Sequence, residues 1–224
     1  MRAGRLLLWR HGRTAHNAEG RLQGQSDIPL DDVGLWQART AAAALLARYK
    51  PTKIVVSDLG RARATAEALA EQAGLDVVVD ARVRERSFGA WEGLTAAEIG
   101  ERWPEEHAAW AAGGEPTRAG GEARATVAAR MVEAVNEHAA GLTDGDTLVV
   151  VSHGAAIGLG VAGLLDLPVD WRGIVGVSNA HWAELRAARG TAPHAWRLTG
   201  YNLGPTDAST DWNAGPDQEV RDPD

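Results

Sequence analysis

The sequence predicts an α/β domain with a largely parallel sheet, because short apolar strands alternate with longer helical stretches along most of the chain. The strand candidates are continuous apolar runs, which are typical of strands buried on both faces of a sheet. Two of these runs end in the same way, in a histidine followed by a glycine. In open α/β sheets, ligands bind in the crevice outside the carboxyl ends of the strands. We therefore expect one site, built from both ends of the chain, at that edge of the sheet.

Four strands and four helices are predicted in the regular part of the chain. The strand candidates are residues 6–10, 54–57, 77–79 and 147–152. The helix candidates are residues 31–49, 61–73, 122–140 and 155–165. The first helix carries apolar residues at helical spacing and is stopped by Pro51, and the second ends at Gly74. These signals place each helix between two strands.

The remaining segments depart from this alternation. Residues 175–185 and 195–203 alternate in the manner of edge strands, and residues 89–121, rich in Trp, Glu and Gly, are expected to form a small helical cap over the site. Residues 204–224 are dominated by polar residues, Gly and Pro, so we expect a flexible tail with little to bury. Residues 1–203 are thus expected to form a single domain that includes the cap.

Length and composition exclude several classes of protein. The chain has 224 residues, 45% of them hydrophobic, which suits one domain with a well-buried core. Its net charge is −7 and it has no long basic block, so nucleic acid is not expected as a partner. The absence of cysteine excludes disulfides, thiolate metal sites and thiol nucleophiles. Only four apolar residues precede Arg10, too few for a signal peptide or a membrane span, so we expect a cytoplasmic protein.

Five charged or polar residues at or near strand ends carry the chemistry. Arg10 and His11 end the first strand, His153 ends the strand 147–152, and Arg61 and Glu85 lie on segments that follow other strands. Guanidinium forks match phosphate oxygens in a bidentate way. The histidines offer a nucleophile and a further donor, and the glutamate offers a proton. These are the parts that phosphoryl transfer requires, without a metal where arginines supply the positive field.

Four sequence elements resemble those of the histidine phosphatase superfamily, also called the phosphoglycerate mutase-like family. They are Arg10-His11-Gly12-x-Thr14 with Asn17, Ser57-x-Leu59-x-Arg61-Ala62, Arg84-Glu85-x-x-Phe88-Gly89-x-Trp91-Glu92-Gly93 and Ser152-His153-Gly154. The elements come in the family's order, and the resemblance covers about residues 5–203. It implies a three-layer α/β/α fold with a mostly parallel sheet, phosphoglycerate mutase-like, with a small helical cap insertion.

The resemblance also implies a role for each of the five residues. His11 would be the nucleophile and form a phosphohistidine, while Arg10, Arg61 and His153 would hold the phosphoryl group. Glu85 would protonate the leaving oxygen and then act as base for water; Glu92, Glu98 and Glu101 are nearby alternatives. The expected substrate contacts are Arg10, Thr14, Asn17, Gln23, Gly24, Arg61, Glu85 and His153. No metal or cofactor is expected, and a homodimer is compatible with the family.

His11 must attack as a neutral imidazole, so its other ring nitrogen needs an acceptor that fixes the tautomer. A metal hydrolase is disfavoured because no His-Glu-x-x-His or Asp-rich ligand set is present.

Several activities remain open within the superfamily. Mutases resemble Glu-Arg-His-Tyr-Gly followed by a lysine-bearing segment, whereas residues 85–93 hold neither Tyr nor Lys, as in the smaller phosphatases. A narrower resemblance is to actinobacterial glucosyl-3-phosphoglycerate phosphatases. It rests on Gly120-Gly121-Glu122, Ser178-Asn179-Ala180-x-Trp182 and Ala195-Trp196-Arg197-Leu198. We therefore expect a phosphomonoester hydrolase acting on a phosphorylated sugar or glycerate ester. The alternatives are mutase-type phosphoryl transfer, an α-ribazole or broad-specificity phosphatase, and a non-catalytic relative that binds a phospho-ligand.

Overall fold

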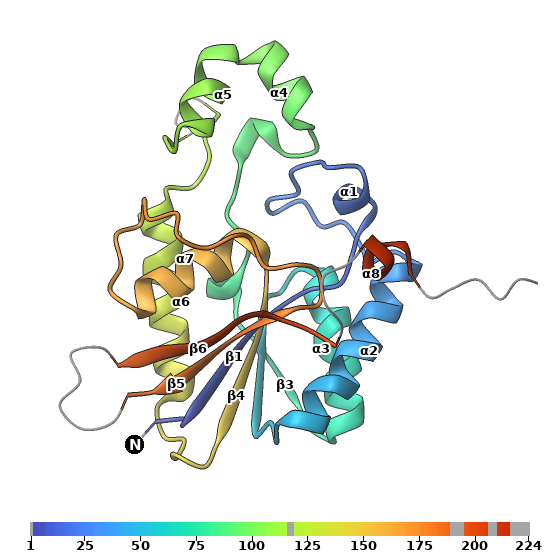
Figure 1. Ribbon diagram of the computed structural model, residues 1–224, viewed down its shortest axis with the longest axis vertical. Helices are drawn as coiled ribbons and strands as arrows, with labels where there is room; N and C mark the ends of the chain where they lie inside the picture. The colour runs from blue at the N-terminus through green and yellow to red at the C-terminus, as the bar shows by residue number, and fades with distance from the viewer. Residues whose placement is uncertain (1, 116–118, 189–194, 206–209, 216–224) are drawn as a thin grey trace, which may run out of the picture.

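The computed structural model describes residues 2–115, 119–188, 195–205 and 210–215, in which a six-stranded sheet lies between layers of helices (Figure 1). The strands run in the order β3-β2-β4-β1-β5-β6 across the sheet. Their bounds are β1 Arg5–Arg10, β2 Lys53–Val56, β3 Val77–Val79, β4 Thr147–Ser152, β5 Trp182–Ala187 and β6 Trp196–Leu203. The predicted α/β class is confirmed.

Most of the sheet is parallel, as predicted. β3, β2, β4 and β1 pair in parallel, whereas β5 and β6 add an antiparallel pair on the β1 side. In the β1–β4 register Arg10 lies opposite Ser152, so the two strands end at the same level. The residues that follow them, His11 and His153, therefore lie next to each other at the carboxyl edge of the sheet.

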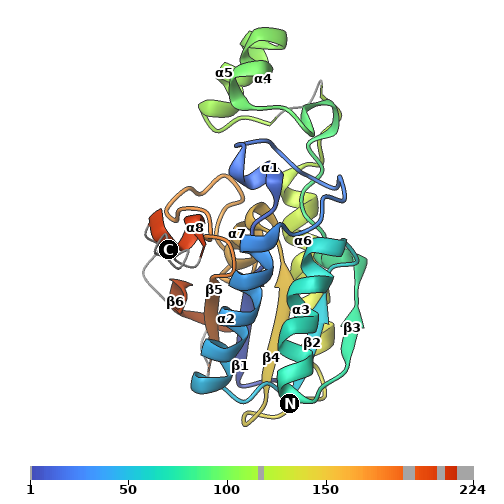
Figure 2. The same cartoon turned by 90° about the vertical axis from the view of Figure 1, so that its right-hand side faces the viewer.

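Successive side chains of a strand point to opposite faces of the sheet, and apolar side chains cover both faces. In β1, Leu6 and Leu8 pack with the α6–α7 layer, while Leu7 and Trp9 pack with the α2–α3 layer (Figure 2). The helices of these layers are α2 Asp32–Arg48, α3 Gly60–Ala73, α6 Arg124–Ala139 and α7 Gly154–Leu164. Because β1 is buried on both faces, its sequence is one continuous apolar run. The expected three-layer α/β/α fold is confirmed.

The helix boundaries follow local signals in the sequence. The Asp31 carboxylate accepts a hydrogen bond from the Gly34 amide at 2.7 Å and so caps the N-terminus of α2. Helix α3 ends at Gly74, whose φ of 66° lies in the left-handed region that glycine adopts at helix ends. The four predicted helices agree with the observed ones to within two residues at each end. Among the described residues, no helix is both long and apolar enough to cross a membrane.

A small helical cap stands above the carboxyl ends of the parallel strands (Figure 1). It contains α4 Ala96–Arg102 and α5 Pro104–Ala111, and the short 3-10 helix η2 Gly89–Trp91 precedes them. Its own apolar cluster centres on Trp91, which is fully buried and meets Trp110 edge to face at 5.7 Å. The Trp-rich segment therefore packs as the predicted cap rather than joining the sheet.

The strand expected over residues 175–185 begins only at Trp182. The preceding residues form a loop, in which the Val177 carbonyl accepts a hydrogen bond from Arg10 at 2.6 Å and Ala180 adopts a φ of 57°. The left-handed conformation of Ala180 departs from the extended backbone of a strand, and the pairing starts two residues after it. β5 is also an interior strand between β1 and β6 rather than an edge strand. Two short helices, α1 Ala15–Ala18 and α8 Thr210–Ala214, were not predicted.

The expectation that the segment after Gly204 buries little is wrong for residues 210–215. Trp212 is only 2% exposed, and its indole N–H donates to the Asn179 carbonyl at 2.9 Å. Its own carbonyl accepts a hydrogen bond from Gln37 at 2.9 Å. The polar composition of the segment predicted exposure, but a single tryptophan can bury a large apolar area. Residues 206–209 and 216–224 of the expected tail lie outside the described residues.

We predict that Trp212→Ala lowers the free energy of unfolding by about 3 kcal/mol, because it removes a buried indole and its hydrogen bond. Urea denaturation checks this value. The matched control is Trp171→Ala, since Trp171 is 39% exposed and its loss should change stability by no more than about 0.5 kcal/mol. Equal effects of the two substitutions would contradict the structural role of α8.

Candidate active site

A cavity of about 270 Å³ lies beside the residues that follow β1 and β4; we call it the central cavity. Seven of the predicted site residues line it, namely Arg10, His11, Asn17, Gln23, Gly24, Arg61 and Glu85. Its other lining residues, which were not predicted as contacts, are Arg21, Leu22, Phe88, Gly154, Ala155 and Gly176. Segments from both ends of the chain thus meet in one place, as the two His-Gly pairs indicated.

The His11 ring is oriented by its own backbone. Its Nδ1 lies 2.6 Å from the Gly12 carbonyl oxygen, which accepts a hydrogen bond, so we assign the proton to Nδ1. The lone pair is then on Nε2, where the Arg61 Nε–H donates to it at 3.3 Å. The side chain is 2% exposed. The geometry therefore presents a neutral imidazole that carries its lone pair on Nε2, on the side of the Arg61 guanidinium.

Burial and charge keep both histidines neutral. Burial lowers the pKa of His11 well below its ordinary value, and the Arg61 and Arg10 guanidiniums lower it further. The pKa of His153 falls for the same reasons, with burial again the largest cause. The two rings lie 5.1 Å apart between centroids. Both rings therefore favour the neutral form.

Glycine follows the nucleophile candidate because the backbone of α2 comes very close. A Cβ on Gly12 would lie 2.3 Å from the Gly34 carbonyl oxygen, a distance that no side chain tolerates. The Gly12 amide donates to Thr65 at 3.1 Å. The Asn179 side-chain amide donates to the His11 and Gly12 carbonyls, each at 3.2 Å. Asn179 thus helps to hold the carbonyl that orients His11, a role the sequence did not reveal.

Arg61 is buried and Arg10 is half-buried, and both donate to backbone carbonyls. Arg61 donates to the carbonyls of Gly24 and Ser26, each at 2.7 Å, and so fixes the loop that follows the nucleophile candidate. The Nε of Arg10 is buried without a hydrogen-bond partner among the described residues. Burial lowers the pKa of each guanidinium, but arginine still remains charged. The central cavity is therefore strongly attractive to an anion.

Glu85 lies at the N-terminus of α7. Its carboxylate accepts hydrogen bonds from the backbone amides of Arg86 at 2.8 Å, Ala156 at 2.9 Å and Ala155 at 3.1 Å. The first-turn amides of a helix lack intrahelical partners, so they are suited to bind a carboxylate. Arg130, a residue of α6, donates to the Glu85 carbonyl at 3.0 Å and so holds the backbone at Glu85. Glu98 and Glu101, by contrast, do not line the central cavity.

Two predicted contacts lie outside the lining. His153 is fully buried against the His11 ring, with its Nε2 2.9 Å from the Ser57 hydroxyl. Thr14 is also fully buried; it caps α1, and its hydroxyl donates to Gln23 Oε1 at 2.9 Å. Thr14 thus holds the loop that carries Gln23, and its contact with substrate stays a prediction. The Nδ1 of His153 has no partner among the described residues.

Glu92, considered from the sequence only as an alternative proton donor, instead joins two loops. Its carboxylate accepts hydrogen bonds from the backbone amides of Gln25, Ser26 and Phe88 at 3.0 to 3.1 Å. Gly24, with a φ of 53°, leaves room for it, since a Cβ there would lie 2.1 Å from Glu92 Oε1. One half-buried carboxylate thus holds the loop that lines the central cavity against the segment that carries Glu85.

We predict that stability falls as the pH drops below about 6.5. The unfolded chain binds protons at its histidines there, whereas buried His11 and His153 do not because their folded-state pKa values are lowered. The free energy of unfolding should then fall at up to about 1.4 kcal/mol per pH unit for each of them. Urea denaturation at pH 7.5, 6.5 and 5.5 in phosphate-free buffer measures this slope. A stability independent of pH over that range would contradict the burial of neutral histidines.

We predict that Glu92→Gln loosens the two loops, because one acceptor oxygen becomes an NH₂ group that faces backbone N–H donors. Amide hydrogen exchange at Gln25 and Ser26 should quicken by about tenfold or more. Glu101→Gln is the control, since Glu101 is exposed in the same region. Unchanged exchange in the Glu92 variant would rule out this bridging role.

Comparisons with known proteins agree with this geometry. The family model described as "Histidine phosphatase superfamily (branch 1)" matches residues 6–202. A glucosyl-3-phosphoglycerate phosphatase of Mycolicibacterium vanbaalenii is 42% identical over 192 residues, 83% of this chain and 85% of that protein. Its counterpart in Mycobacterium tuberculosis is 43% identical over 193 residues, 83% of this chain and 86% of that protein.

A solved mycobacterial glucosyl-3-phosphoglycerate phosphatase, in complex with VO3, is 41% identical and superposes with a TM-score of 0.80. The match covers 91% of this chain and all of that one. The match over nearly the whole domain, together with the paired histidines, arginines and glutamate, shows that the chain belongs to the histidine phosphatase superfamily.

Proposed function

We propose that this phosphatase hydrolyses a phosphomonoester through a phosphohistidine formed on His11. The observation that carries the proposal is the state of His11: a buried, neutral ring with its proton on Nδ1 and its Nε2 lone pair next to a guanidinium. Arg10, Arg61 and Glu85 line the same cavity. One cavity therefore offers a nucleophile, two cations and a carboxyl group.

In the first step, His11 Nε2 attacks the phosphorus atom of the ester. The N–P bond forms as the bond from phosphorus to the ester oxygen breaks, and Glu85 gives its proton to the departing oxygen. Arg10 and Arg61 neutralise the charge on the remaining phosphoryl oxygens. The positive charge that develops on the imidazole is stabilised by the hydrogen bond from Nδ1 to the Gly12 carbonyl.

In the second step, water attacks the phosphohistidine. Glu85, now a carboxylate, takes one proton from the water as the new P–O bond forms and the N–P bond breaks. Inorganic phosphate leaves and His11 returns to its neutral form. The same carboxyl group thus acts as acid and then as base, and the amides of Ala155 and Ala156 hold it in position.

The substrate that we propose is glucosyl-3-phosphoglycerate, a phosphorylated glycerate ester that carries a sugar. Support comes from the relatives named for that activity, which are 42 to 43% identical to this chain. A larger cavity of about 400 Å³ adjoins the central cavity and offers space for the remainder of such an ester. Phosphate release should be compared across glucosyl-3-phosphoglycerate, 3-phosphoglycerate, α-ribazole phosphate, sugar phosphates and an aryl phosphate. Preference for another ester by orders of magnitude would overturn this assignment.

We predict that His11→Ala abolishes phosphate release, with a loss of at least about 10³-fold in kcat, because no other group in the central cavity replaces the nucleophile. The control is His16→Ala, since His16 is close in sequence but does not line the cavity. Circular dichroism and a melting curve confirm that each variant folds. Retained turnover by His11→Ala would contradict the phosphohistidine mechanism, and loss of wild-type activity to a chelator would contradict its independence of metal.

A further inference from the structure

The larger cavity beside the central cavity, which we call the side cavity, has a distinctive charge. The two cavities lie next to each other, since they share four lining residues, namely Phe88, Gly154, Ala155 and Gly176. Three arginines line the side cavity, namely Arg86, Arg124 and Arg172, and no acidic residue is found among its lining residues in the described chain. The mechanism uses none of these three cations.

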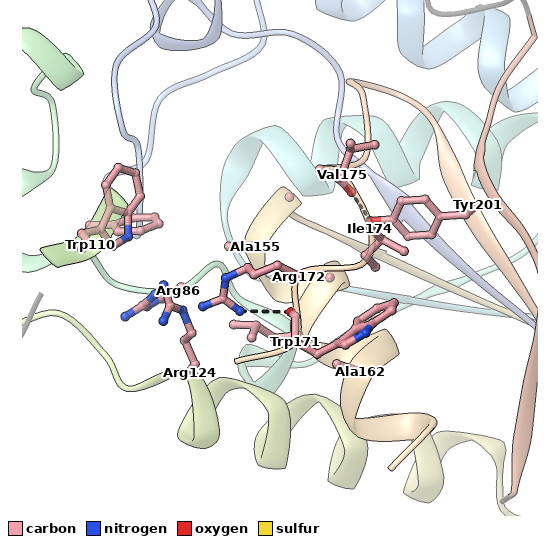
Figure 3. A pocket seen from close by; sticks show the side chains of 15 residues that line it. Arg86, Trp110, Arg124, Ala155, Ala162, Trp171, Arg172, Ile174, Val175 and Tyr201 are labelled. Carbon is pink, nitrogen blue, oxygen red and sulfur yellow. Dashed lines mark hydrogen bonds between the residues drawn. The ribbon is translucent and has the colours of Figure 1, made fainter. Parts of the chain in front are cut away.

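The three guanidiniums gather at one side of the side cavity, near Trp110 (Figure 3). The Gly113 carbonyl accepts hydrogen bonds from both Arg124 at 2.5 Å and Arg172 at 3.3 Å, which brings these two side chains together. Arg86 and Arg124 both pair with Glu115. Like charges so close repel one another, and the carboxylates that act on them, Glu115 and Asp170, number one fewer than the three cations.

Two of the arginines have capacity left for a ligand. Arg86 is engaged with the Glu122 carbonyl and Glu115 and is almost fully buried. Arg172 is exposed and donates only to backbone carbonyls among the described residues. Burial lowers the pKa of Arg124, and the Arg172 and Arg86 charges add to this, while Glu115 and Asp170 act against it. Positive charge is therefore concentrated and incompletely compensated at Arg124 and Arg172.

The rest of the side cavity is apolar and partly aromatic. Trp110 and Trp171 contribute indole rings, and the floor is formed by small or apolar residues of α7. A Cβ on Gly158 would meet no atom within 4 Å, so the cavity is open above this glycine. An apolar pocket with a few convergent polar groups is typical of a small-molecule site.

We propose that the leaving group of the substrate occupies the side cavity and carries a second anion, a carboxylate, which Arg124 and Arg172 bind. The proposal rests on the proposed function, since it requires the phosphoryl group in the central cavity. A glycerate-type alcohol has such a carboxylate close to its ester oxygen. The neutral remainder of the leaving group, such as a sugar, lies over Gly158 between the aromatic walls.

The test compares two esters that differ only in charge: glucosyl-3-phosphoglycerate and its carboxamide, in which the carboxylate is neutral. Wild-type kcat/KM should be about 10- to 100-fold higher for the carboxylate, the range expected for a hydrogen bond to a charged group. Arg172→Gln should reduce this preference by lowering kcat/KM for the carboxylate alone, since Arg124 remains, and Arg172→Lys should restore part of it. Arg102→Gln is the control, because Arg102 is exposed in the cap and does not line the side cavity.

A second variant probes the occupied volume without altering any charge. Gly158→Leu should lower kcat/KM for glucosyl-3-phosphoglycerate at least about tenfold and leave 3-phosphoglycerate, which lacks the sugar, nearly unchanged. Leucine is a good helix former, so the variant should fold.

The outcomes separate the two proposals. Equal wild-type rates on the carboxylate and carboxamide esters, or an equal effect of Arg172→Gln on both, would overturn the anion site and leave the proposed function standing. Hydrolysis of an aryl phosphate with no activity on either glycerate ester would overturn the proposed substrate and the anion site together.

Discussion

The hydrogen bond from His11 Nδ1 to the Gly12 carbonyl is the interaction on which the site depends, because it fixes which ring nitrogen can attack. The carbonyl itself is held by Asn179, and the close approach of α2 requires glycine at position 12. The parallel register of β1 and β4 then sets the His11 ring beside that of His153. Local backbone geometry and sheet topology thus determine the tautomer, the position and the surroundings of one imidazole.

Buried charge is the second constraint. Arg10 and Arg61 would be costly to bury without partners, and carbonyls from the loops around the central cavity supply hydrogen bonds to both. These bonds fix the loops as well as the cations, and Glu92 fixes the same loop from the other side. The result is a cavity in which burial, and after it the positive field, lowers the pKa of both histidines, while the same field attracts an anion. Fold stability and binding therefore rest on the same contacts.

Much of this could be predicted from the sequence. Continuous apolar runs predicted the strands that end at Arg10 and Ser152, and helical spacing predicted the main helices to within two residues. The site residues at strand ends came together because parallel strands end at one edge. What could not be predicted depends on contacts between distant segments. Thr14 is fully buried and bonded to Gln23, and Trp212 is buried although its surroundings in the sequence are polar. The three arginines of the side cavity come from separate segments without a shared motif.

The measurement that tests the account most directly is the identification of a covalent phosphoenzyme. Enzyme mixed with ³²P-labelled substrate and quenched within one turnover should carry an acid-labile, base-stable phosphate. Peptide mapping should place it on His11, and chromatography against the two phosphohistidine standards should show attachment through Nε2, since Nδ1 is engaged with the Gly12 carbonyl. Phosphate attached through Nδ1, or found on another residue, would contradict the account.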